Sequence, residues 1–141
     1  LEINKLYKEI IVTSEACPLW VPIIENNEHN SDGADYFVKK NLENLLKSDP
    51  EIDTLMLGCT HYPLMLDKIK KYTPSGITII SQGELVAASL SDYLKRHPEM
   101  DVKCTKNSSI RYFTTESVDK FSSSASIFLN EAIVAEHLDI D

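Results

Sequence analysis

Short apolar runs that alternate with longer amphipathic segments are the feature that most constrains the fold of this 141-residue chain. Residues 53–57 are too short for a helix core and are bounded by Gly58, so they are predicted to be a buried strand, and residues 76–81 are predicted to be a second short strand. Helical spacing of apolar residues follows each run, over 62–72 and 84–96. This alternation predicts an α/β fold with a mainly parallel sheet.

The remaining segments extend the same alternation in both directions. Residues 1–10 have the spacing of the end of a helix, and 10–16 form a β-rich run. An amphipathic helix is expected over 34–47, a strand over 110–114 and a helix over 117–130. The predicted inward faces of these two helices carry Phe37, Val38, Leu42, Leu45 and Leu46, and Phe121, Ala125, Phe128 and Leu129.

Charge and composition exclude several classes of function. The formal net charge of −8 disfavours binding to a phosphate backbone, so no nucleic acid is expected as a partner. No stretch approaches the ~20 apolar residues of a membrane helix, and no signal segment opens the chain. Three cysteines without a disulfide-like spacing indicate a reducing, cytoplasmic setting, and no zinc-ligand spacing is present.

The chemically informative segment is DTLMLGCTHYPL, residues 53–64. A predicted strand leads into Gly58, Cys59, Thr60 and His61, and a predicted helix follows at once. Ligands of open α/β sheets bind beyond the carboxyl ends of the strands, where Cys59 lies. A helix N-terminus favours a thiolate and can hold a carboxylate, and His61 can exchange a proton with Cys59 or a substrate.

Other interpretations of these residues stay open at this level. A cysteine after an apolar strand can be an inert core residue, and a Cys–His pair can bind a metal. No further ligand candidate has a suitable spacing, so no metal is expected.

Several segments resemble glutamate racemases, in the order in which that family carries them. These segments are ACPLWVPIIE at 16–25, LGCTHYPL at 57–64, GITIISQGE at 76–84 and Tyr112-Phe113-Thr114. Aspartate racemases of the same superfamily usually have glutamate at the position of His61. The resemblance therefore favours glutamate as the substrate.

The resemblance implies a mechanism without pyridoxal phosphate or a metal, in which two cysteines face each other across the substrate. Cys59 would act on the L-glutamate face, His61 would assist it, and Thr60 would bind the substrate. Glu25 matches a glutamate near the family's active site, although its residue type alone also suits a solvated loop acid. The D-glutamate formed would supply bacterial peptidoglycan and so cell shape.

The resemblance also implies flavodoxin-like units in two lobes. Residues 1–81 would form most of the second lobe, and residues 82–141 would return to complete the first lobe, whose main part is absent. The family's aspartate–serine pair and its Cys-Asn-Thr motif do not occur here, because Cys17 precedes Pro18 and Cys104 precedes Thr105. Cys17 is interpreted as structural and Cys104 as exposed.

The chain is therefore expected to hold half of an active site and to be inactive alone. Its start at Leu1, within a helical pattern, suggests a fragment. The apolar faces of the two late helices would lie exposed, which favours a homo-oligomer or local disorder. Two alternatives remain, namely a racemase or isomerase of the same superfamily with another acidic substrate, and a non-catalytic ligand-binding fragment.

Overall fold

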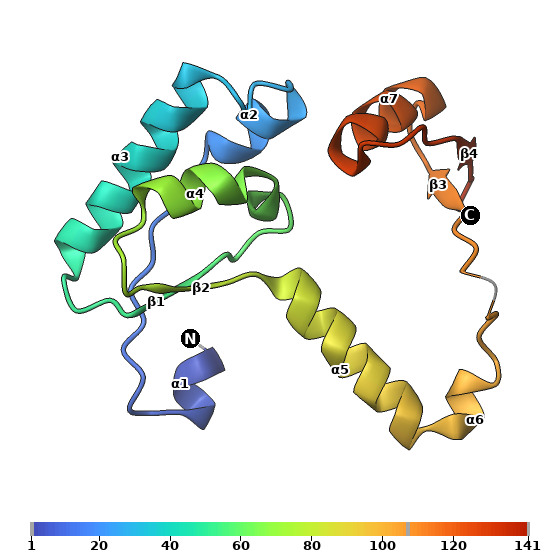
Figure 1. Ribbon diagram of the computed structural model, residues 1–141, viewed down its shortest axis with the longest axis horizontal. Helices are drawn as coiled ribbons and strands as arrows, with labels where there is room; N and C mark the ends of the chain where they lie inside the picture. Colours follow the sequence, from blue (N-terminus) through green and yellow to red (C-terminus); the bar gives the residue numbers. More distant parts are fainter. Residues whose placement is uncertain (1, 107, 141) are drawn as a thin grey trace. The chain divides into compact units, whose positions relative to one another are not determined.

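The computed structural model describes residues 2–106 and 108–140, so the expectation for Leu1 lies outside the described residues. The chain divides into two compact units, Leu1–Ser81 and Gln82–Asp141 (Figure 1). Each unit contains a pair of parallel strands whose connection includes a helix. The predicted α/β class with parallel strands is confirmed. The assignment of the two units to racemase lobes stays a prediction.

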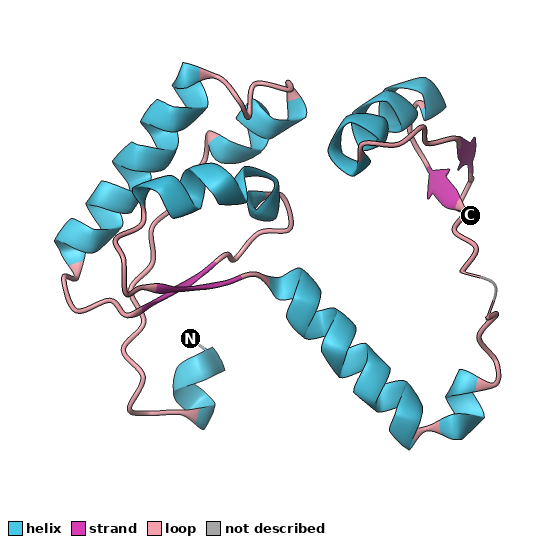
Figure 2. Ribbon diagram, in the orientation of Figure 1, coloured by secondary structure: helices cyan, strands magenta, loops and turns pink. Residues whose placement is uncertain are grey.

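The first unit contains most of the described helices and one strand pair (Figure 2). Its elements are α1 (Glu2–Leu6), α2 (Trp20–Glu25), α3 (Asp32–Ser48), β1 (Thr54–Met56), the 3-10 helix η1 (Tyr62–Met65), α4 (Leu66–Tyr72) and β2 (Thr78–Ile80). The second unit contains α5 (Gln82–Arg96), α6 (Pro98–Asp101), β3 (Tyr112–Thr114), α7 (Val118–Leu129) and β4 (Ala135–His137). In Figure 1, helices α2, α3 and α4 gather on one side of β1 and β2.

Helix α3 forms because its ends are capped and one face is apolar. The Ser31 hydroxyl accepts a hydrogen bond from the backbone N–H of Ala34 at 3.2 Å, which satisfies a free donor of the first turn. The buried face consists of Ala34, Val38, Leu42 and Leu45. This confirms most of the predicted face, although Phe37 and Leu46 are only half-buried.

A cluster around Asp35 joins α3 to α4. The ammonium groups of Lys68 and Lys71 lie 2.5 Å and 3.0 Å from its carboxylate, and the Tyr72 hydroxyl donates to it at 2.7 Å. The hydrogen bond from Lys68, followed by those from Tyr72 and Lys71, holds the pKa of Asp35 well below its usual range. The cluster thereby fixes the helix that follows the Cys59 segment.

Strand β1 pairs in parallel with β2, with Thr54 opposite Thr78 and Met56 opposite Ile80. The prediction that 53–57 is a buried strand is correct in type and wrong in burial. Thr54 and Met56 are exposed, and the buried residue is Leu57, just beyond the strand. The reason is that β2 is the partner of β1 among the described residues, so this sheet has two strands and much of its surface stays open.

The prediction of a strand over residues 10–16 is wrong, because the structure has a loop there (Figure 2). A strand requires a ladder of backbone hydrogen bonds, and the described residues show none between this segment and β1. Side chains hold the segment instead. The Thr13 hydroxyl donates to Asp49 at 3.0 Å, and the Asn41 amide donates to the carbonyl of Ala16 at 3.3 Å.

The second unit buries few side chains. Helices α5 and α7 have no buried residue among those described, and the buried apolar residues of this unit are Ile133 and Ala135. The prediction that Leu129 faces inward is wrong, because it is 51% exposed on α7, a helix with no buried residue among those described. Strand β4, which pairs in parallel with β3, was not predicted at all.

Candidate active site

The turn after β1 carries the residues singled out from the sequence. It is closed by a hydrogen bond from the backbone N–H of Tyr62 to the carbonyl of Cys59 at 3.2 Å. The N–H of Leu64 then donates to the carbonyl of His61 at 3.0 Å. The α-helix expected to begin at Tyr62 begins at Leu66, and the 3-10 helix η1 occupies the interval. Cys59 is thus followed by a tight 3-10 turn, with His61 at its N-cap.

Three of the predicted site residues lie in a line at this turn. The sulfur of half-buried Cys59 is 4.0 Å from Nδ1 of His61. On the other side of the imidazole ring, Nε2 lies 3.5 Å from Oε1 of Glu25. Glu25 is the last residue of α2, so this helix brings a carboxylate to the turn from an earlier part of the chain. The role of Glu25 as a site residue stays a prediction.

This arrangement allows proton transfer between Cys59 and His61. A carboxylate next to Nε2 favours the imidazole form that carries a proton there, which leaves Nδ1 free to accept a proton from the thiol. When both ring nitrogens are protonated, the imidazolium charge stabilises a Cys59 thiolate. Because His61 and Glu25 are partly exposed, water reaches the outer end of the line.

Thr60, the fourth predicted site residue, is exposed at the same turn. The substrate-binding role assigned to Thr60 stays a prediction.

Cys17, interpreted as structural from the sequence, and Tyr62, whose N–H closes the turn, have shifted pKa values. Burial, followed by the charge of Glu15, raises the pKa of the Cys17 thiol to about 11, so Cys17 stays protonated at neutral pH. The Cys17 thiol donates to the backbone carbonyl of Glu15, with a sulfur–oxygen distance of 3.8 Å. Burial, followed by the charges of Cys17 and Cys59, raises the pKa of the Tyr62 phenol.

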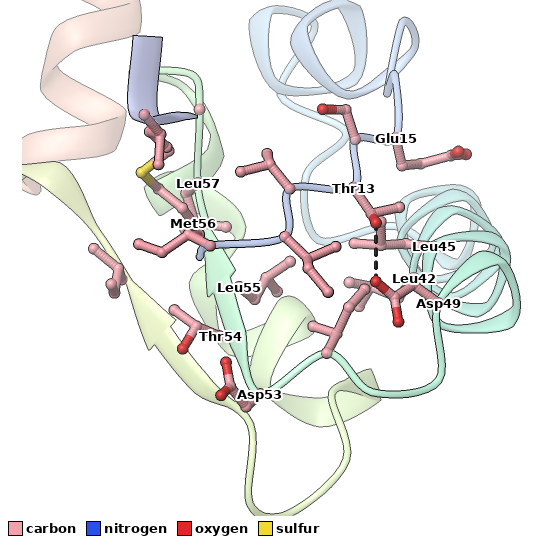
Figure 3. A pocket seen from close by; sticks show the side chains of 18 of the residues that line it. Thr13, Glu15, Leu42, Leu45, Asp49, Asp53, Thr54, Leu55, Met56 and Leu57 are labelled. Atoms are coloured by element: carbon pink, nitrogen blue, oxygen red, sulfur yellow. Dashed lines mark hydrogen bonds between the residues drawn. The ribbon is translucent and has the colours of Figure 1, made fainter. Parts of the chain in front are cut away.

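A cavity of about 920 Å³ lies behind the turn, between the loop 9–15, helix α3 and strand β1 (Figure 3). Leu42 and Leu45 from α3 and Leu55 and Leu57 from the β1 segment contribute much of its apolar lining. The hydrogen bond from Thr13 to Asp49 crosses one side of it (Figure 3). The cavity reaches the site turn at Gly58 and Tyr62.

Two features are absent from residues 2–106 and 108–140, the ranges that the structure describes. Within these ranges, no group of three or more His, Cys, Asp or Glu side chains is placed to hold a metal ion. Across the same ranges, no helix has the length and apolar character needed to span a bilayer.

Comparison with known sequences confirms the predicted resemblance. No family model matches the chain. The glutamate racemase of Lactiplantibacillus plantarum is 36% identical over 92% of this chain and 47% of its own length. That of Streptococcus uberis is 37% identical over 99% of this chain and 52% of its own length. The chain thus spans about half the length of the curated relatives it matches.

Comparison with solved structures gives the same result for the fold. The structure of glutamate racemase isoform RacE1 from Bacillus anthracis matches with a TM-score of 0.80 and 35% identity, over 98% of this chain and 50% of that one. The glutamate racemase of Francisella tularensis, solved in complex with D-glutamate, matches with a TM-score of 0.75 and 29% identity, over 99% of this chain and 50% of that one.

Proposed function

We propose that this chain, which is related over nearly its whole length to about half of a glutamate racemase, contributes one side of the active site that interconverts L- and D-glutamate. The observation that carries the proposal is the line from Cys59 through His61 to Glu25. Residues 1–81 would be one racemase lobe, and residues 82–141 would belong to the other.

The chemistry requires a base on one face of the substrate and an acid on the other. The Cys59 thiolate removes the α-proton of L-glutamate, and a thiol on the opposite face donates a proton to the carbanion. In the reverse direction, Cys59 as a thiol donates the proton. The described part of the chain offers no comparable second cysteine, because Cys17 stays protonated behind the turn and Cys104 is exposed in the other unit. The chain therefore supplies half of the site.

The neighbours of Cys59 account for its reactivity in this proposal. His61 accepts the thiol proton and returns it, and Glu25 orients the ring and stabilises its protonated form. Thr60, exposed at the turn, binds the substrate through its hydroxyl or backbone N–H. Neither a metal nor an organic cofactor takes part in these steps.

The biological role follows from the product. The Francisella tularensis relative was solved with D-glutamate, which supports glutamate as the ligand of this site. D-glutamate made by this reaction would serve bacterial peptidoglycan synthesis in the cytoplasm and so contribute to cell shape.

A chimeric enzyme tests the proposal directly. This chain is joined to the half of the Bacillus anthracis racemase that it does not match, and racemisation of L-glutamate is followed in deuterium oxide. The chimera should form D-glutamate with deuterium at Cα, and Cys59→Ser should lower kcat by about 10²–10⁴-fold, because a serine hydroxyl is a poor base at neutral pH. His61→Asn should lower kcat more in the L-to-D direction than in the reverse.

The matched control is Cys104→Ser, which changes an exposed cysteine and should leave turnover unchanged. Near-normal activity of the Cys59→Ser chimera would overturn the assignment of Cys59. Activity with another acidic amino acid in place of glutamate would favour the alternative superfamily substrate. The 141-residue chain alone should produce no D-glutamate, and such production would contradict the half-site argument.

A further inference from the structure

The backbone of Tyr62 is part of the turn that carries Cys59. Its backbone N–H closes that turn on the carbonyl of Cys59, and it directly follows His61. Any contact that fixes the Tyr62 side chain therefore also restrains the positions of Cys59 and His61. Such a contact exists, because the Tyr62 ring meets the Trp20 ring edge-on, with ring centroids 4.7 Å apart and planes at 61°.

Trp20 is itself firmly held. It is 3% exposed, and its indole N–H donates to the side-chain carbonyl of Asn41 on α3 at 3.0 Å. The Asn41 amide in turn donates to Glu15 at 2.9 Å, on the loop that precedes α2. Because these polar atoms are paired, Trp20 has a defined place and orientation between α2 and α3.

Trp20 also begins the helix that ends at Glu25. Helix α2 has six residues, so fixing its first residue restrains where its last carboxylate lies. The ring contact thus joins two elements that each carry part of the site. One of them holds Glu25, and the other holds His61 and Cys59.

We infer that Trp20 and Tyr62 form a positioning clamp that sets the spacing of Glu25, His61 and Cys59. The inference rests on the proposed function for its biological meaning, but its geometry belongs to the chain itself. Tyr62 is a positioning residue, because it acts through the turn and needs no contact with the substrate. The ring contact with Trp20 sets the spacing.

The groups that face the His61 ring give the clamp a measurable consequence. Cys59 faces Nδ1 from the turn, and the Glu25 carboxylate faces Nε2 from α2. Protonated His61 at this distance stabilises the thiolate of Cys59, and neutral His61 does not. If the turn loses the ring contact between Tyr62 and Trp20, the distance from the Cys59 sulfur to Nδ1 of His61 varies. The reactivity of Cys59 then no longer depends on the charge of His61.

The test measures the alkylation of Cys59 by iodoacetamide in the 141-residue chain, with peptide mass spectrometry to separate it from the other cysteines. At about pH 6 the unmodified chain should react about fivefold faster at Cys59 than His61→Gln, as expected for a unit charge near 4 Å in water. At about pH 9, where histidines are neutral, the two rates should converge.

The clamp is then removed in both backgrounds. With Tyr62→Ala, the ratio of the two rates at about pH 6 should fall below about twofold. Tyr62→Phe keeps the ring and should keep the ratio. The matched control is Tyr72→Phe, which removes a tyrosine hydroxyl that donates a hydrogen bond to Asp35, and it should also keep the ratio. If Tyr62→Ala unfolds, Tyr62→Leu keeps apolar volume without an aromatic ring and takes its place.

Each outcome decides between interpretations. An unchanged ratio in folded Tyr62→Ala or Tyr62→Leu would overturn the clamp. The absence of any His61 effect in the unmodified chain would also overturn it, because there would be no geometry to position. These results are distinct from failure of the proposed function, which is measured as racemisation by the chimera. If the chimera racemises glutamate but the alkylation rate of Cys59 does not depend on His61, the proposed function stands and the clamp is overturned.

Discussion

The two units of the chain build the same small motif with very different amounts of buried surface. In one, the connection between parallel strands β1 and β2 contains η1 and α4, and in the other the connection between β3 and β4 contains α7. The first unit buries nine apolar residues of its described part, including Trp20, Val38 and Ile69, whereas the second buries Ile133 and Ala135. The comparison shows that a parallel strand pair with its crossover forms in both units, while its packing depends on additional helices.

Helices α2 and α3 account for the larger number of buried residues in the first unit. They cover the first unit and are tied to the crossover by the Asp35 cluster and by the contact of Trp20 with Tyr62. The second unit has α5 instead, whose residues Leu85, Val86 and Leu90 stay exposed. The candidate site lies in the well-packed unit, which suits a function that needs fixed distances between side chains.

The largest expected effect comes from the crossover helices themselves. Ile69→Ala on α4 removes a side chain that is 0% exposed and should destabilise the first unit by about 2–5 kcal/mol. Ile127→Ala on α7, where the side chain is 49% exposed, is the matched change and should leave that unit nearly unaffected. Urea unfolding followed by fluorescence of Trp20, the single tryptophan, measures the first unit. Equal transitions for Ile69→Ala and the unmodified chain would contradict the comparison.

The Asp35 cluster should make the first unit sensitive to acid. A carboxyl whose pKa is depressed in the folded state stabilises it above the usual range of aspartate, and this contribution disappears as the pH falls toward the depressed value. Asp35→Asn should therefore lower the urea midpoint at pH 7 and weaken its dependence on pH below about 4. Asp119→Asn on exposed α7 serves as the control. A steep acid dependence that survives in Asp35→Asn would assign it to other groups.

The N-caps provide a matched pair of smaller changes. The Ser31 hydroxyl accepts from the N–H of Ala34 at 3.2 Å, and that of Ser117 accepts from the N–H of Lys120 at 3.3 Å. Each serine-to-alanine change should cost about 1 kcal/mol of helix stability. With Ser31→Ala the loss should appear as a lower midpoint of one cooperative transition. With Ser117→Ala it should appear as faster amide exchange along α7, because few packing contacts join α7 to a core.

The smallest expected effect belongs to an ion pair of the second unit. Arg111 and Glu136 join β3 to β4 through a bidentate contact with nitrogen–oxygen distances near 2.9 Å, and both side chains are more than half exposed. Arg111→Ala should therefore cost only about 0.2–1 kcal/mol, and less at high salt. Arg96→Ala, which removes an exposed pair with Asp92 in α5, is the reference. A loss well above this range would show that the pair is central to the second unit.

Helices and side-chain contacts could be predicted from the sequence where the interactions that determine them are local. Helix α3 follows from one apolar face and a serine cap, and the contact between Cys59 and His61 joins residues only two positions apart. Glu25 could be placed near them only through the resemblance to a family, because nothing in its residue type indicates a distant partner. The role of Tyr62 was missed for the same reason, since it depends on Trp20 from another helix.

Strands were predicted less well because they depend on partners. Residues 10–16 have strong β-forming composition and yet remain a loop beside β1, held by side-chain hydrogen bonds. Strand β4 has the sequence Ala135-Glu136-His137, which carries little β-forming signal, and forms because β3 is available beside it. A strand therefore depends on backbone partners that neither segment's composition reveals.

The matching topology of the two units has a consequence for how fast they form. Thr54 must meet Thr78, and Tyr112 must meet Ala135, so the two loops to be closed are almost equal in length. Because the entropic cost of closing a loop grows only slowly with its length, the cost of bringing the two strands together is nearly the same in both units. Interactions that form after the rate-limiting step mainly slow unfolding. The two units should thus acquire their strand pairs at similar rates, and the first should retain its pair far longer.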